Sequence, residues 1–381
     1  MVKRSLLHEQ IAATLREEIQ RCGRPGQRLD ADTKQTARFG VSVVTVREAL
    51  RLLCQEGLLE RRHGSGTYVT DRCRRPRVAV VSRAGTGDSP AFFYHRRVLD
   101  CAVEALKAAG TDSEVILEPG ILRKAPSPSC LAGLVAEAPG RLQGVVTFLC
   151  SADAAAVAAV ERAGVPVVGH DESHYPYFVT NDHRAIIRES VRLLVGHGRR
   201  RIAFMQPGAG GPGTQPGEWY LLDEFRAALA EAGVRFRREW VCSALDPLTP
   251  GSGWDHFHGI WRGRKEKPDG MLVGLDTVFP ETAMAVLSLG ISVPRDLLVV
   301  THASAGSGMF YPFPVVRLEF DARRHAEAAV RMLMQRLRGE PTAEPNLYLP
   351  FVTQGTDVVE QALRRPPARR SLELARSVAR A

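Results

Sequence analysis

The sequence has no long hydrophobic run. Nowhere do about 18 apolar residues follow one another, so no membrane-spanning helix is expected. The N-terminal segment MVKRSLLHEQIAATLREEI is charged throughout and lacks the apolar core and small-residue cleavage site of an export signal, which favours a cytoplasmic protein. The 7 cysteines form no CxxC pair and no paired Cys/His spacing. We therefore expect reduced, separate thiols rather than disulfides or zinc ligands.

Catalytic and cofactor motifs are also missing. The glycine-rich segment 208–213 lacks the Lys-Ser/Thr of a phosphate-binding loop and does not fit GxGxxG, so no nucleotide site is expected. His256 and His258 form an isolated HxH with no third ligand evident, which favours an ordinary loop over a metal site. No Ser/His/Asp arrangement is evident either. We expect no enzyme, no metal site and no cofactor.

The positive charge is concentrated at one end of the chain. Residues 1–77 hold 16 Lys/Arg against 9 Asp/Glu, a net charge of +7, and residues 356–381 hold 6 against 3, a net charge of +3. Because the whole chain has a net charge of +9, the 278 residues between these segments have a net charge of −1. A basic segment attached to a neutral body is typical of nucleic-acid binding confined to one end. A solvated basic surface would give the same count, so the charge supports this interpretation without proving it.

Apolar spacing predicts three helices in the basic segment. The first covers residues 5–21, with a buried stripe every four residues at Leu7, Ile11, Leu15 and Ile19. The second extends from a capping Asp32 to Phe39. The third lies between Ser42, a good N-cap, and Gly57, and its predicted buried stripe is Val46, Ala49, Leu50 and Leu53.

Short β-runs accompany these helices. Arg28 and Leu29 can form a brief strand, and the runs 58–62 and 66–70 flank a glycine-containing turn at 63–66. Helix, helix-turn-helix and a hairpin wing thus fill a domain over residues 1–71, followed by a basic linker at 72–77.

The segment TVREALRLLCQEGLLERRHGSGTYV resembles the winged helix-turn-helix of GntR-type bacterial transcription regulators, over roughly residues 5–70. This resemblance implies DNA as a partner and assigns the contacts. Ser42 and Thr45 would hold phosphates, Arg47 would contact a guanine edge, and His63 and Gly64 would enter the minor groove. The chemistry agrees, since arginine binds guanine with two hydrogen bonds and hydroxyls suit phosphates.

Two arginines that are usual in this family are absent. The family commonly has P-S-E-R before the second helix, where residues 30–33 are Asp-Ala-Asp-Thr, and S-R where residues 42–43 are Ser-Val. We therefore expect an operator unlike the common consensus, with Arg51 as a further contact on the exposed helix face. Val43 and Val44 either belong partly to the core or meet thymine methyl groups.

Beyond residue 77 the pattern alternates between apolar β-runs and helical segments. The strand candidates are 78–83, 142–149, 165–171, 200–206, 269–276 and 296–302. The helix candidates are 97–109, 152–163, 183–196, 220–232, 279–289 and 323–338. Continuous apolar strands separated by helices predict parallel sheets arranged as two α/β lobes over residues 78–355. Residues 356–381 are expected to form a basic C-terminal tail, of which 364–381 is expected to be solvated or disordered.

The body resembles the LacI-type sensor domain, a type I periplasmic-binding-protein-like fold. The resemblance depends on VPVVGHD, LLVGHGRRRIAFM and DGMLVGLDTVFPETAMAVLSLGISVPRDLLVV. It implies an effector between the lobes, near loops that follow the strands. The positions it implies are Asp276, Asp171 and the pair Phe92 and Phe93. Carboxylates and aromatic faces suit a sugar. The alternatives are a helix N-cap for Asp276, a solvated charge for Asp171 and core positions for the phenylalanines.

One departure concerns the ligand clamp of that family. Where R-x-x-G-F is usual, residues 221–225 are Leu-Leu-Asp-Glu-Phe, so Leu221 replaces the arginine. Trp219 or Tyr220 then either stacks on the ligand or packs beneath the preceding loop. We expect a ligand-responsive, homodimeric transcription regulator, and a repressor rather than an activator. The alternatives are a small-molecule binding protein without a DNA role and a regulator whose sensor has lost its effector.

Overall fold

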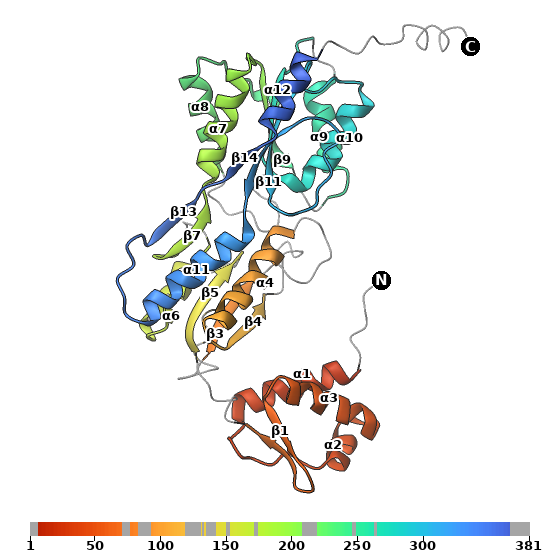
Figure 1. Cartoon of the computed structure of the whole chain (residues 1–381), viewed down its shortest axis with the longest axis vertical. Coiled ribbons are helices and arrows are strands. Elements are labelled where there is room, and N and C mark those ends of the chain that lie inside the picture. Colours follow the sequence, from red (N-terminus) through yellow and green to blue (C-terminus); the bar gives the residue numbers. More distant parts are fainter. Residues whose placement is uncertain are drawn as a thin grey trace, which may run out of the picture.

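The computed structural model describes residues 7–70, 77–82, 93–118, 131, 133–134, 142–149, 153–170, 174–207, 219–245, 249–262 and 265–365. Residues 7–70 form a small head, and the described residues from 77 onward form a body with two lobes (Figure 1). The predicted fold class, a winged helix-turn-helix followed by a two-lobed parallel α/β body, is confirmed.

The head packs its helices around one apolar core. These helices are α1 (Leu7–Cys22), α2 (Asp32–Phe39) and α3 (Val43–Gln55). The predicted stripe of α3 is buried in full, and α1 contributes Ile11, Leu15 and Ile19 to the same core. Leu7 is 53% exposed, so its place in the predicted stripe was wrong. It is the first residue of α1 and lies beyond the edge of the core.

The wing is an antiparallel hairpin of β1 (Leu59–Arg62) and β2 (Gly66–Val69). The chain segment before α2 joins it as predicted, because Arg28 bridges to Tyr68 and Leu29 donates its backbone N–H to the carbonyl of Thr67 at 2.9 Å. These contacts hold the wing against the helices, at a fixed position relative to α3.

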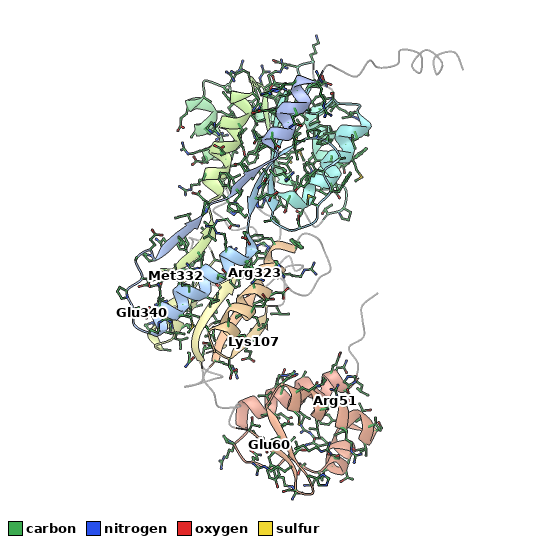
Figure 2. All side chains as sticks on the ribbon, in the orientation of Figure 1. Arg51, Glu60, Lys107, Arg323, Met332 and Glu340 are labelled. Carbon is green, nitrogen blue, oxygen red and sulfur yellow. The ribbon has the colours of Figure 1, made fainter. Side chains whose placement is uncertain are left out.

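The first lobe contains a parallel sheet in the order β4-β3-β5-β6. Its strands are β3 (Arg77–Ser82), β4 (Ser113–Leu117), β5 (Leu142–Phe148) and β6 (Val167–Val168). Helices α4 (Phe93–Ala108) and α11 (Ala322–Leu337) cover one face, and α6 (Ala154–Arg162) packs on the other. Arg323 of α11, labelled in Figure 2, reaches Glu104 of α4 at 2.9 Å. Burial on both faces explains why the central strands are apolar throughout.

The second lobe contains a sheet in the order β14-β12-β11-β10-β8-β9, in which only β14 is antiparallel. Its strands are β8 (Ile202–Pro207), β9 (Val241–Leu245), β10 (Gly270–Val273), β11 (Leu298–Ser304), β12 (Val316–Phe320) and β14 (Val352–Gln354). Helices α7 (His183–Gly196) and α8 (Trp219–Glu231) cover one face, and α9 (Ser252–Trp261) and α10 (Phe279–Ser288) cover the other.

The chain passes between the lobes near residues 181–183, 320–322 and 349–352. Two of these passages are adjacent, since β7 (Phe178–Asn181) pairs in parallel with β13 (Asn346–Leu349). The carboxyl ends of the central strands of both sheets point toward this junction. Short connecting strands of this kind suit a hinge between two rigid lobes.

The body continues past residue 355, where the basic C-terminal tail was expected to begin. Residues 356–364 form α12 (Thr356–Arg364), and Val359 of this helix is fully buried in the core of the second lobe. The charge count of 356–381 did not indicate this helix, because only Arg364 of the 6 arginines lies in it. The remaining tail, 366–381, and the linker 71–76 lie outside the described residues.

Candidate nucleic-acid interface and interlobe site

The start of α3 presents two hydroxyl groups. Ser42 caps the helix, accepting the backbone N–H of Thr45 on its Oγ at 3.2 Å, and the two side-chain oxygens are 2.8 Å apart. The first amides of a helix attract anions, and hydroxyl groups beside them are suited to phosphate oxygens. The structure therefore brings Ser42 and Thr45 together at the place where a phosphate contact was predicted.

The two valines at the start of α3 differ in exposure. Val43 is half-buried, whereas Val44 is 76% exposed. The core alternative is therefore wrong for Val44. This exposure leaves Val44 available for the predicted contact with a thymine methyl group, which stays a prediction.

Arg47 projects from the same end of α3 and is held by a carboxylate. Its Nε donates to Oδ2 of Asp32 at 2.9 Å, and Arg61 on β1 donates through Nη2 to the same oxygen at 3.3 Å. The prediction that Asp32 caps α2 was wrong. Ala31 is the N-cap residue, no side chain caps the helix, and the Asp32 carboxylate binds arginines instead.

Arg51 follows one turn later on the exposed face of α3. It forms hydrogen bonds with Glu48 at 2.5–3.1 Å. These hydrogen bonds raise the pKa of Arg51 and lower the pKa of Glu48, so the pair stays ionised and largely self-neutralised. Arg51 is therefore less available to DNA than Arg47 in this arrangement, and its predicted contact stays a prediction.

The wing turn carries the other two predicted contacts. His63 and Gly64 are exposed between β1 and β2, and Gly64 has φ +71°, a left-handed conformation that favours glycine. The hairpin behind the turn is braced by Arg62, which lies 4.7 Å above the Tyr68 ring. A hydrogen bond of 2.6 Å between the side-chain oxygens of Ser65 and Tyr68 also stabilises the hairpin. The wing thus offers a rigid, exposed tip.

In the body, Asp276 lies beyond the carboxyl end of β10. It is 6% exposed, and its Oδ2 accepts a hydrogen bond of 2.6 Å from the hydroxyl of Ser304 on β11. The alternative role as a helix N-cap is contradicted, because neither the 3-10 turn at Asp276 nor α10 after it has a side-chain cap. A buried carboxylate at the ends of parallel strands is suited to binding ligand hydroxyls or amino groups.

A histidine cluster surrounds this region at the junction of the lobes. In the first lobe, the ring centroid of His170 lies 5.9 Å from that of His95 and 6.1 Å from that of His325, on which it stacks. In the second lobe, His183 and His302 lie 6.0 Å apart. No motif identified these residues as a group, because they are dispersed in sequence and the fold alone brings them together.

Burial favours the neutral form of His95, His183, His302 and His325, and the cluster is incompletely hydrogen-bonded. Burial lowers the pKa of His95, His183 and His325 to about 3, and repulsion among the histidines adds to the shift. Burial also lowers the pKa of His302, which the Asp276 charge opposes. Among the described residues, no hydrogen-bond partner is found for either buried ring nitrogen of His302 or for the buried Oε1 atom of Gln206. Buried polar groups normally have partners, so these atoms point to a bound molecule or water.

Other predicted effector positions are only partly described. Phe92 and Asp171 lie outside the described residues, and the side chains of Trp219 and Tyr220, at the start of α8, are likewise outside the description. Phe93 is half-buried in the first turn of α4. The next residue, Tyr94, was not predicted, yet its hydroxyl donates to Asn181 at 3.0 Å and lies 3.2 Å from Nδ1 of His325.

The described residues contain no group of three or more His, Cys, Asp or Glu side chains placed to hold a metal ion. None of the described helices combines the length and apolar composition needed to cross a bilayer. Leu221, at the position of the missing arginine, is partly buried against the core of the second lobe.

Comparison with known proteins finds matches for both parts of the chain. Residues 7–69 match the bacterial regulatory proteins of the gntR family, and residues 191–356 match the periplasmic binding protein-like domain. The mannosyl-D-glycerate transport/metabolism system repressor MngR of Escherichia coli is 47% identical over 66 residues, which is 17% of this chain and 28% of that protein. The HTH-type transcriptional repressor PurR of Glaesserella parasuis is 26% identical over 125 residues, which is 32% of this chain and 36% of that protein.

The chain thus spans well under half the length of either relative. Among solved structures, the transcriptional regulator CelR in complex with cellobiose aligns with a TM-score of 0.59 at 17% identity, covering 86% of this chain and 98% of that one. A putative LacI regulator from Bacillus cereus aligns with a TM-score of 0.58 at 16% identity, over 74% of this chain and 97% of that one. The chain therefore joins a segment that matches the gntR family of bacterial regulatory proteins to a body that matches the periplasmic binding protein-like domain and has the fold of LacI-type regulators.

Proposed function

We propose that this protein is a ligand-responsive bacterial transcription regulator, whose head binds operator DNA and whose body binds a small molecule. The observation that carries the proposal is the exposed end of α3. There the hydroxyls of Ser42 and Thr45 lie at the helix N-terminus and Arg47 follows on the exposed surface of the first turns, in a basic segment with 16 Lys/Arg against 9 Asp/Glu that also carries the wing. This combination provides both phosphate contacts and base contacts in one surface.

The test is binding of the full chain to duplexes selected from a random library, measured against salt. Replacing Arg47 by alanine should weaken binding of the selected duplex about tenfold or more, since a bidentate arginine–guanine contact contributes about 1–3 kcal/mol. Arg338→Ala is the matched control, because Arg338 is a similarly exposed, carboxylate-paired arginine on the body. Absence of any selected sequence would instead favour a small-molecule binding protein without a DNA role.

The ligand that the body supports best is a sugar or sugar derivative between the lobes. Asp276 is buried and held by Ser304, so it can accept hydrogen bonds from paired hydroxyls. The unpartnered nitrogens of His302 and the unpartnered oxygen of Gln206 add neutral donors and acceptors. The cellobiose complex of a structural neighbour of the same fold agrees with this ligand class.

A homodimer would place two heads on a palindromic operator. Phe310 is 80% exposed on the loop between β11 and β12, and the adjacent Tyr311 packs on Phe279 at the start of α10. Met284 and Leu287 of α10 are about half exposed. Exposed apolar side chains on neighbouring elements favour a protein–protein contact.

In this proposal, closure of the lobes on the ligand changes the spacing of the heads in the dimer and hence the affinity for the operator.

Repression is the mode of action that the relatives support, because both MngR and PurR carry that name. Binding to chromosomal operators would place the protein in the cytoplasm. A regulator that has lost its effector is the second candidate. Leu221 favours it, since this side chain packs against the core where the arginine clamp is usual.

A further inference from the structure

Asp32 connects the three elements that form the DNA-facing side of the head. It is the first residue of α2, and its Oδ2 accepts from Arg47 on α3 at 2.9 Å and from Arg61 on β1 at 3.3 Å. The Asp32 side chain is 20% exposed, whereas the side chains of Arg47 and Arg61 are 59% and 54% exposed. One half-buried negative charge thus holds two arginines that face solvent.

The atoms used in these contacts determine what Arg47 can still do. Arg47 binds Asp32 through Nε, and within the described residues no partner is found for its Nη1 or Nη2. A guanine presents O6 and N7 side by side, and an arginine needs two neighbouring N–H groups to bind both. Holding the side chain by Nε therefore leaves the outer edge of the guanidinium oriented for base contact.

We propose that Asp32 is a positioning residue for base recognition, which fixes Arg47, and with it Arg61, before DNA binds. This inference depends on the proposed DNA-binding function and adds a residue to it. The benefit is pre-organisation, because a long arginine side chain otherwise loses its rotamer freedom on binding. Fixing Arg47 ahead of contact favours the sequences it matches over those it does not.

Electrostatics alone predicts the opposite effect for Asp32. A carboxylate on a DNA-facing surface repels phosphates, so its removal should tighten binding to any duplex. Under the positioning role, removal tightens or leaves unchanged the binding of arbitrary DNA while binding of the selected operator weakens. The ratio of the two affinities therefore separates the explanations.

Asp30 provides a matched control. Its carboxylate lies two residues earlier, is 61% exposed and pairs with Lys34 at 3.2 Å, without contact to Arg47. Asp30→Ala and Asp32→Ala remove the same charge from the same edge of the head. Only Asp32→Ala removes the support of the two arginines.

The experiment uses the full chain and two probes, a duplex selected from a random library by the wild-type protein and a shuffled duplex of equal length. Asp32→Ala should reduce the affinity ratio between the probes at least about fivefold, while Asp30→Ala leaves it unchanged and Asp32→Glu largely restores it. In an Arg47→Ala background, Asp32→Ala should no longer reduce the ratio, which a purely structural role for Asp32 would not produce.

The inference is overturned if the wild type discriminates between the probes and Asp32→Ala discriminates equally well. It is also overturned if Asp32→Ala reduces the ratio by the same factor with and without Arg47, because Asp32 then acts on the fold and not through the arginine. If the wild type itself shows no preference for any duplex, the proposed DNA-binding function fails, and the positioning role fails with it.

Discussion

At the scale of single residues, the front of α3 combines conventional and unusual features. Ser42 lies at the N-cap and Arg47 on the exposed face, which are the positions that the proposed DNA contacts need. Val44 is the unusual residue, since 76% of an apolar side chain is left in water where it stabilises nothing in the head. Such exposure is explained if the valine meets an apolar group of the partner.

Val44 allows a direct test with modified DNA. Contact with a thymine methyl group should contribute about 0.8 kcal/mol, roughly fourfold in affinity, by analogy with burial of one methylene. Replacing the contacted thymine by uracil should weaken wild-type binding by that factor and leave Val44→Ala unaffected. The measurement is titration of both proteins with operators carrying uracil at successive positions. Equal sensitivity of the two proteins at every position would show that Val44 contacts no thymine.

Residue patterns predicted the helices of the head well, because helix periodicity and capping depend on residues that are close in sequence. Ser42 as N-cap and the buried stripe of α3 follow from helix periodicity and capping chemistry, which act within a few residues. The role of Asp32 did not follow, because its partner Arg47 lies 15 positions away on another helix. Side-chain pairing across elements depends on packing that periodicity does not encode.

At the scale of elements, long apolar segments were predictable and short or mixed ones were not. α7 begins and ends where its pattern predicts, and β3, β5, β8, β10 and β11 overlap the predicted runs to within three residues at their ends. The strands β4, β7, β9, β12, β13 and β14 had no predicted run, because they are short and most of them carry polar residues. All of them except β12 lie at sheet edges or crossovers, where the apolar pattern is weak.

The helix α12 illustrates how tertiary packing overrides composition. Residues 356–364 were assigned to the basic C-terminal tail, but one fully buried residue, Val359, anchors them to the second lobe. Val359→Ala should lower the free energy of unfolding by about 2 kcal/mol, from lost burial and the cavity that remains. Val358→Ala is the control on the same helix, since Val358 is 48% exposed and should cost less than about 0.5 kcal/mol.

Urea denaturation of the full chain, followed by circular dichroism, measures both variants. Equal and negligible effects of Val358→Ala and Val359→Ala would mean that this segment is not docked, as the composition had suggested. A larger effect of Val359→Ala shows that the body extends to at least residue 364.

At the scale of the whole molecule, the arrangement separates two tasks and connects them through a hinge. In the proposed function the head presents charged and hydroxyl groups to DNA, and the body encloses polar groups, the Asp276 carboxylate among them, between two lobes. Strand ends from both lobes meet there, with Asp276 from one lobe and the stacked His170 and His325 from the other. A ligand that contacts both lobes would favour their closed arrangement.

The interlobe site was only partly predictable. Asp276 was predicted because the resemblance implies ligand contacts in loops that follow strands. The histidine cluster was not predicted, because it combines residues from α4, α7, α11 and β11 that only the crossover topology brings together. Ligand identity depends on these distant side chains, which explains why sequence patterns indicated a sugar without specifying one.

Operator affinity with and without ligand tests the central claim most directly. A thermal-shift screen of sugars identifies the compound that stabilises the wild type most and loses this effect in Asp276→Asn. The selected operator is then titrated with the full chain in the presence and absence of that compound. We expect the compound to change the operator affinity of the wild type at least about fivefold and to leave that of Asp276→Asn unchanged. A compound that binds between the lobes and leaves operator affinity unchanged would contradict this expectation.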